Sequence, residues 1–259
     1  MRGLALEGGG VRGAYQIGVV KALMDNGYVF DGFVGTSVGA VNAAILAQGD
    51  INKAIELWTN ITVEKLFAKD EQAIIRFAGM TDLMAEFTLQ ASLERYAAIR
   101  KILRNGGMDT SIIEKFLEDY IDEEAVRNSG KDFGLVTISI SDRMPLELTL
   151  EDIPQGQLFD YVMASASLPG FKPIVIKGKK FLDGAFYNNC PYNLLLEKNY
   201  DEVIVIRTNA RGVFPKVKDS RVKLILPEQE LGSIMLFTHE NCIEKMEIGY
   251  NMGLNYVRA

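Results

Sequence analysis

Gly35-Thr36-Ser37-Val38-Gly39 is the stretch of this chain that decides its fold. The apolar run 29–34 precedes it directly, and the run 38–48, rich in small residues, follows it with the pattern of a helix. In this strand–turn–helix context, the G-x-S-x-G pattern predicts a turn so tight that a Cβ at Gly35 or Gly39 would clash with the adjoining strand and helix. The turn would lift the Ser37 hydroxyl clear of the sheet, at a helix N-terminus where backbone N–H groups stabilise negative charge. Ser37 is therefore a candidate nucleophile.

The segments around this turn predict an α/β fold with a mainly parallel sheet. Residues 3–7 and 29–35 have the pattern of buried strands, and the helix-like run 13–26 lies between them, so the chain begins as a β-α-β-α unit. Further strands are expected at 133–141, 146–150, 203–207 and 222–226, a hairpin at 173–182 around Lys177-Gly178-Lys179, and further helices at 51–60, 159–165, 191–199 and 240–257.

The bulk properties favour one domain spanning residues 1–259. No linker, repeat or low-complexity tract divides the chain, and 48% of its residues are hydrophobic. The net charge of −6 argues against nucleic acid as a partner. The cysteines, Cys190 and Cys242, cannot form a disulfide framework and indicate a reducing compartment. With neither a signal peptide nor a run of about 18 apolar residues, we expect a cytoplasmic protein, at most peripheral to a membrane.

A glycine-rich loop follows the first strand. Its residues are Gly8, Gly9, Gly10, Val11, Arg12 and Gly13. Successive glycines let several backbone N–H groups point into one concavity, and at a helix N-terminus such a nest favours an anion. The anion can be a phosphate or the oxyanion of an acyl-transfer intermediate. The same pattern also fits a dinucleotide fingerprint with Asp31 as the ribose ligand, or a plain tight turn.

Asp183 is the candidate base for Ser37. It opens Asp183-Gly184-Ala185 after the apolar Phe181-Leu182, a pattern that is also typical of an ordinary turn. A serine hydroxyl needs a base to take its proton, and the chain has one histidine, His239. A Ser…Asp…His triad has the α/β-hydrolase order, but in that fold the serine follows several strands rather than the second. A Ser37–Asp183 dyad is the other assignment, because partial desolvation raises the basicity of a carboxylate.

Taken together, these elements resemble the patatin-like phospholipases. The likeness covers residues 3–209 and includes a small-residue helix end and proline turn at 164–173. It implies a three-layer α/β fold and a lipid acyl hydrolase, a phospholipase or esterase, with Ser37 as nucleophile and Asp183 as base. By the same likeness, oxyanion donors come from Gly9, Gly10 and their neighbours, and Arg12 shapes the loop. Alanine at 185 departs mildly from the glycine that many relatives carry.

The resemblance also implies a lipid or other acyl-ester substrate and neither a metal nor an organic cofactor. The helical insert at 61–130 has broken apolar segments that either form a lid over an acyl-chain pocket or simply cover the sheet. Basic groups at 172–180 and 207–223 either attract anionic headgroups or are solvated faces. Three further hypotheses stay open: a nucleotide-binding module, a non-catalytic lipid-binding protein of the same fold, and an acyltransferase.

Overall fold

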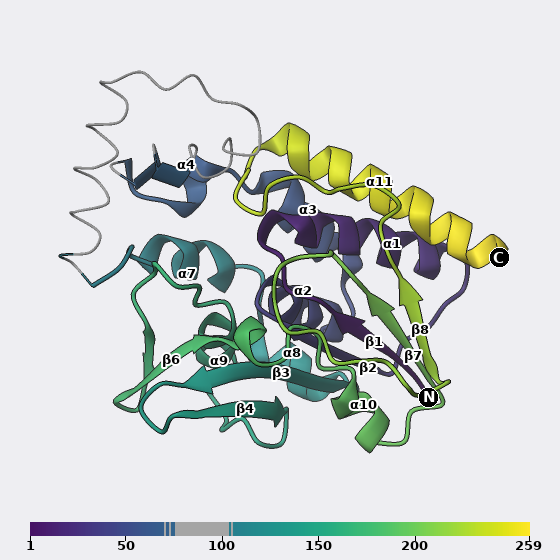
Figure 1. Ribbon diagram of the computed structural model, residues 1–259, viewed down its shortest axis with the longest axis horizontal. Coiled ribbons are helices and arrows are strands. Elements are labelled where there is room, and N and C mark those ends of the chain that lie inside the picture. The colour runs from purple at the N-terminus through teal and green to yellow at the C-terminus, as the bar shows by residue number, and fades with distance from the viewer. Residues whose placement is uncertain (70, 73, 76–103, 105) are drawn as a thin grey trace.

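A mixed β-sheet forms the centre of the molecule (Figure 1). The computed structural model describes residues 1–69, 71, 72, 74, 75, 104 and 106–259. Within these residues the sheet has eight strands, in the spatial order β5 (Ile174–Ile176), β6 (Lys179–Asp183), β3 (Asp132–Ser139), β2 (Gly32–Thr36), β1 (Arg2–Leu6), β7 (Glu202–Ile206) and β8 (Val222–Ile225), with β4 (Met144–Thr149) paired to β3 outside this order.

The middle of the sheet is parallel and one side of it is antiparallel. Strands β1, β2, β3, β7 and β8 run in the same direction. Strands β4 and β6 are antiparallel to β3, and β5 forms with β6 the hairpin expected around Lys177 and Gly178, both of which have positive φ. The α/β class and the mainly parallel sheet predicted from the sequence are confirmed.

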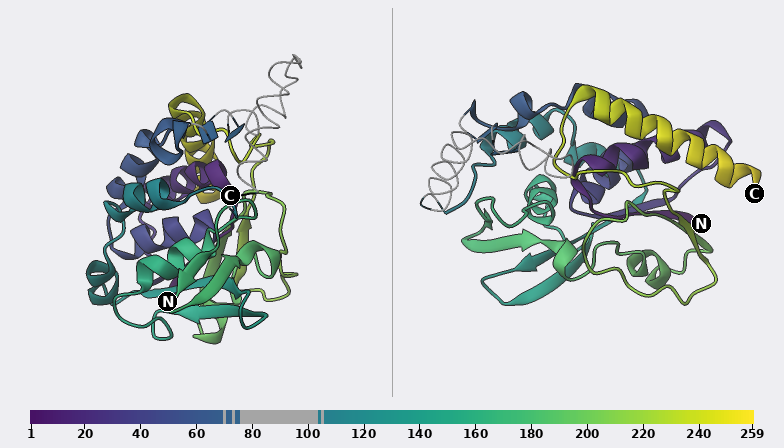
Figure 2. Two further views of the ribbon diagram at one scale, coloured as in Figure 1. Left: turned by 90° about the vertical axis from the view of Figure 1, so that its left-hand side faces the viewer. Right: turned by 45° about the horizontal axis from the view of Figure 1, so that its top comes forward.

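Helices cover the two faces of the sheet unequally (Figure 2). The larger core lies under α1 (Gly13–Asp25), α2 (Val38–Ala47), α3 (Ile51–Asn60), α9 (Leu158–Ser165) and α11 (His239–Arg258). The smaller core, on the other face, lies under α10 (Asn193–Glu197). The expected three-layer arrangement is therefore uneven, because the helical layer on this second face of the sheet is thin.

Helices α1 and α11 pack closely because glycines lie at their crossing. A Cβ on Gly18 would come within 2.0 Å of Met246 O, and one on Gly249 within 2.0 Å of Tyr15 O. The side-chain oxygen of Asp50 caps α3 by accepting hydrogen bonds from the N–H groups of Asn52 and Lys53. None of the described helices combines the length and the apolar character needed to cross a bilayer.

Two predicted elements are shorter than expected. Strand β2 begins at Gly32 rather than at 29, because Val29 is 71% exposed and Asp31 turns back to accept a hydrogen bond from the Arg2 N–H. The helix expected at 191–199 is limited to Asn193–Glu197. Within the insert, the described helices are α4 (Val63–Leu66), α7 (Ser111–Glu118) and α8 (Glu123–Asn128). The lid prediction depends on the apolar residues of segment 63–87, and five of them lie outside the described residues: Phe77, Met80, Leu83, Met84 and Phe87.

Candidate active site

Ser37 occupies a strained turn between β2 and α2. Its backbone has φ 57° and ψ −129°, a conformation that residues with a Cβ rarely adopt. A Cβ on Gly35 would lie 2.2 Å from Gly39 O, and one on Gly39 would lie 2.2 Å from Leu6 O. Only glycine fits at these positions, because the first turn of α2 presses against both β1 and β2. The strain at Ser37 is thus maintained by the packing on either side.

The register of β3 explains how Asp183 meets this turn. Strand β4 occupies one edge of β3 from Gly134 to Ser139, so β2 and β6 must share the other edge. Strand β2 ends there with Thr36 beside Val136, and β6 arrives from the opposite direction and ends with Asp183 beside Thr137. The carboxyl ends of the two strands therefore meet head to head, one residue apart along β3, and Ser37 directly follows Thr36.

The environment of Asp183 favours a proton-accepting carboxylate. The side chain is fully buried, and burial is the main cause that raises the pKa of Asp183 to about 6. Two groups oppose this effect and lower the pKa: the Ala185 N–H, which donates to Oδ1 at 2.8 Å, and the Ser37 hydroxyl. Among the described residues Oδ2 has no hydrogen-bond partner. Ser37 is thus near enough to affect the carboxylate, although the pair makes no hydrogen bond of ordinary length and angle.

The carboxyl end of α9 and the residues after it bind the backbone of Ser37 and of Asp183. Ser165 Oγ accepts a hydrogen bond from the Ser37 N–H at 2.9 Å, and the Ser167 carbonyl accepts one from the Asp183 N–H at 2.9 Å. Both serines are buried. The small-residue segment at 164–173 therefore fixes the backbone of the nucleophile candidate and of the base candidate together, a role that its sequence alone did not reveal.

The glycine loop reaches the same place from β1. A Cβ on Gly8 would lie 3.0 Å from Ser37 Cβ, and Gly10 lines the same pocket as Ser37. Within the described residues, the N–H groups of Gly9 and Gly10 make no hydrogen bond. The other four N–H groups of the loop are already used: Gly8 N–H donates to Asn189 O, Val11 N–H to Ile234 O, Arg12 N–H to Gly9 O, and Gly13 N–H to Gly10 O and Val11 O. Of the six predicted oxyanion donors, Gly9 and Gly10 are thus the two whose N–H groups have no acceptor among the described residues.

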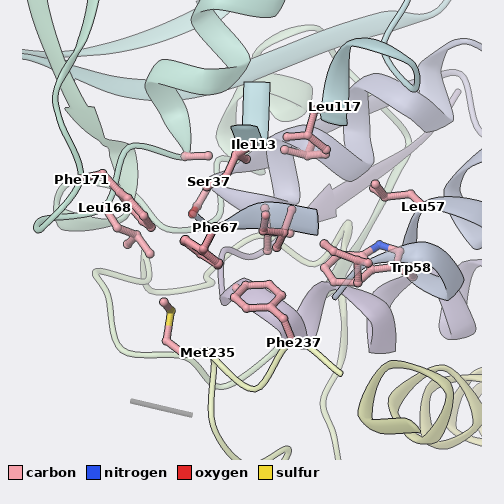
Figure 3. Close-up of a pocket in the computed structure, with 16 residues that line it drawn as sticks. Ser37, Leu57, Trp58, Phe67, Ile113, Leu117, Leu168, Phe171, Met235 and Phe237 are labelled. Atoms are coloured by element: carbon pink, nitrogen blue, oxygen red, sulfur yellow. The ribbon is translucent and has the colours of Figure 1, made fainter. Parts of the chain in front are cut away.

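An apolar pocket extends away from Ser37 (Figure 3). It encloses about 680 Å³, including the part open to solvent. In the close-up, Ser37 lies near Leu168 and Phe171, and Trp58 and Leu57 lie at the far side. The remaining lining is also almost entirely aliphatic or aromatic: Val38, Val41, Ile61, Leu66, Phe67, Ile113, Leu117, Ala166, Met235 and Phe237. Such a surface fits a hydrocarbon chain rather than a polar ligand.

A model of the patatin-like phospholipase family matches residues 4–196, three-quarters of the chain. The chain belongs to this family. Among curated relatives, an uncharacterized NTE family protein of Mycobacterium tuberculosis is 29% identical over 206 residues, which are 79% of this chain and 30% of the relative. Lysophospholipase nte1 of Aspergillus terreus is 30% identical over 188 residues, 72% of this chain and 10% of the relative. This patatin-like chain thus spans less than a third of the length of either relative.

Solved structures support the same fold. The chain is similar to VipD from Legionella pneumophila, with a TM-score of 0.55, 15% identity, and coverage of 99% of this chain and 66% of that one. It is also similar to human GIVD cytosolic phospholipase A2 in a complex with methyl γ-linolenyl fluorophosphonate, with a TM-score of 0.51, 13% identity, and coverage of 100% and 58%. At these identities the likeness concerns the fold alone.

Two alternatives raised by the sequence do not fit the geometry of this patatin-like chain. His239 is the first residue of α11, and its Nδ1 lies 2.8 Å from Thr59 O on α3 rather than against Ser37 or Asp183. Asp31 binds the Arg2 N–H at the amino end of β1, whereas the glycine loop follows the carboxyl end of that strand. A ribose ligand at Asp31 would therefore lie at the opposite end of the parallel strands from the glycine loop.

Glu7 and Arg12 brace the glycine loop from two sides. The fully buried Glu7 carboxylate accepts hydrogen bonds from the N–H groups of Thr208 and Asn209 and pairs with Arg207 at 2.9 Å. The Arg12 guanidinium donates to the carbonyl oxygens of Gly232, Thr208 and Asn209. These hydrogen bonds tie Arg12 to the segments around 208 and 232, and its role in shaping the loop stays a prediction from the family resemblance. Glu7 was not predicted as a site residue from the sequence, although a single acidic residue at the end of an apolar strand can indicate one.

The predicted basic groups are only partly available to a ligand. Lys172, Lys179, Arg207 and Arg221 form ion pairs with Asp109, Asp142, Glu7 and Asp219. No ion pair is found in the described part of the chain for the exposed Lys177, Lys180, Arg211, Lys216, Lys218 and Lys223. The same part of the chain contains no group of three or more acidic, histidine or cysteine side chains placed to hold a metal ion.

Proposed function

We propose that the protein is a serine lipid acyl hydrolase that cleaves fatty-acyl esters through an acyl-serine intermediate on Ser37, with Asp183 as general base. The observation that carries this proposal is the head-to-head meeting of β2 and β6, which sets a strained serine beside a buried carboxylate. The apolar pocket that begins at Ser37 supports a fatty-acyl chain as the part of the substrate that is held.

In the first step, Ser37 Oγ attacks the ester carbonyl while Asp183 accepts the hydroxyl proton. Burial raises the pKa of Asp183 to about 6, so the carboxylate is a stronger base than an exposed aspartate yet remains ionised at neutral pH. The alcohol leaves with that proton, and the acyl group stays on Ser37. Asp183 then takes a proton from water, which attacks the acyl-serine, and returns that proton to Ser37 Oγ as the fatty acid leaves.

The negative charge on the carbonyl oxygen needs donors that are already in place. The Gly9 and Gly10 N–H groups are the available pair in the glycine loop, and Gly10 lies in the pocket wall with Ser37. Donors that make no other hydrogen bond do not have to break one when the oxyanion forms, and such preorganised stabilisation is often the largest catalytic contribution. The hydrogen bonds that the Val11 and Gly13 N–H groups donate within the protein keep the loop in its conformation.

Covalent labelling and two matched substitutions test the proposal. An organophosphonate ester should label Ser37, and Ser37→Ala and Asp183→Asn should each lower kcat on a p-nitrophenyl ester by at least about 10³-fold, with a double variant no worse than either. His239→Ala should retain activity. If Asp183→Asn keeps most of the rate, or His239→Ala loses it, the dyad is wrong. Product analysis with an added alcohol separates hydrolysis from acyl transfer.

A further inference from the structure

Three large apolar side chains are exposed just beyond the proposed base. Strand β6 ends at Asp183, and the 3₁₀ turn Gly184–Phe186 follows at once. Phe186 is 55% exposed, Tyr187 47% and Val213 50%. The two segments that carry these side chains lie side by side, because the Val213 N–H donates to Ala185 O at 2.9 Å and Val213 O accepts from the Asn189 N–H at 2.6 Å. Exposed aromatic side chains gathered in this way mark an interaction site more often than isolated ones do.

The same surface has a positive border in a chain that is acidic overall. Arg211 precedes Val213 by two positions, and Lys216 and Lys218 follow it in the same loop; all three side chains are exposed. Among the described residues none of them forms an ion pair, whereas the whole chain has a net charge of −6. A basic border around exposed aromatic groups complements an anionic lipid surface, since the cations pair with phosphates while the rings enter the headgroup region.

We propose that Phe186, Tyr187, Val213 and Arg211 form a docking surface for an anionic phospholipid bilayer. The inference rests on the proposed function, because a substrate with a long acyl chain resides in a bilayer and must pass from it to Ser37. Docking through the turn that directly follows Asp183 would bring the membrane close to the end of β6, where the proposed base is buried. The tyrosine hydroxyl and the guanidinium stay at the level of the headgroups while the apolar parts are inserted.

Vesicle flotation tests the surface separately from catalysis. The protein carries Ser37→Ala throughout, so lipid is not consumed, and the vesicles are phosphatidylcholine alone or with about 30% phosphatidylglycerol. Phe186→Ser/Tyr187→Ser should weaken binding to the mixed vesicles by at least about tenfold. The matched control is Val29→Ser, which removes a side chain that is 71% exposed near the amino end of β2, at the opposite end of that strand from Ser37, and should change nothing.

Charge is tested in the same assay. Arg211→Glu should weaken binding to the mixed vesicles about fivefold or more, remove most of the preference for the anionic lipid, and reduce the sensitivity to salt. Lys223→Glu, an equal charge change on the exposed side of β8, is its control. Thermal unfolding midpoints equal to that of the parent protein show that each variant is folded.

The outcomes separate this inference from the proposed function. With Ser37 restored, the Phe186/Tyr187 variant should hydrolyse soluble p-nitrophenyl butyrate normally but lose activity on vesicles. Unchanged flotation of that variant, or equal losses in the Val29 control, would overturn the docking surface while leaving the esterase intact. A parent protein that is dimeric in light scattering and becomes monomeric in the variant would assign the surface to a second copy of the chain instead. Vesicle binding without any esterase activity would refute the proposed function alone.

Discussion

Replacing Asp183 by asparagine should stabilise the protein while removing its activity. The carboxylate is buried, without a cationic partner among the described residues, and its pKa rises from the ordinary 3.8 to about 6. The native state therefore binds the proton more tightly than the unfolded chain does, so stability falls as the pH rises from about 4 through 6. Above pH 7 the ionised side chain costs about 3 kcal/mol, which is the shift of about two pKa units at 1.36 kcal/mol each.

Urea unfolding of the two proteins between pH 5 and pH 8 measures this cost. Asparagine keeps an oxygen for the Ala185 N–H but does not ionise, so the stability difference should grow by about 1.4 kcal/mol from pH 5 to pH 8. The change of this stability difference with pH is the decisive quantity. The new amide also alters the free energy of unfolding, but by the same amount at every pH. Asp119→Asn, an exposed change beside α7, serves as the control. A difference that is constant with pH would refute the reasoning.

The remaining predictions concern the reaction itself. The kcat/KM for a short soluble ester should rise with pH through about 6, because burial raises the pKa of Asp183 to that value and only the ionised form is a base; an inflection near 4 in the pH–rate profile would contradict this. Ser165→Ala removes the acceptor of the Ser37 N–H and should lower kcat by roughly ten- to a hundredfold with little change in KM, whereas a purely structural role would lower the thermal midpoint and leave kcat intact. Ile113→Trp should lower kcat/KM for p-nitrophenyl palmitate at least about tenfold relative to the butyrate, because Ile113 lines the pocket. Ile112 is the next residue in the chain but does not line the pocket, so Ile112→Trp should not have this effect.

The local part of the site was accessible from the sequence. A short-range clash dictates Gly35 and Gly39, so the turn around Ser37 is encoded within five residues. The strand and helix patterns likewise depend on neighbours along the chain. The main error in the first strands, the early start predicted for β2, has a local cause as well: the apolar Val29 resembles a strand residue but is exposed.

The long-range part of the site was not accessible in this way. Whether Asp183 meets Ser37 depends on which edge of β3 is left open by β4, and on a register that ends β2 and β6 one residue apart. No pattern within either strand specifies that register. The choice of amides in the glycine loop depends in the same way on acceptors such as Asn189 O and Ile234 O, which belong to distant segments.

One physical cause, the burial of Asp183, links the proposed chemistry to the stability of the fold. Burial makes the carboxylate a better base for Ser37, and the same burial destabilises the native state at neutral pH. A histidine or a nearby cation would relieve the destabilisation, but a cation would also lower the pKa of Asp183 and weaken it as a base. The carboxylate is instead held by one N–H donor at Oδ1, and Oδ2 is left without a partner in the described structure. A substitution that admits water to Asp183 should therefore increase stability and reduce activity together, whereas one that only disturbs packing should reduce both.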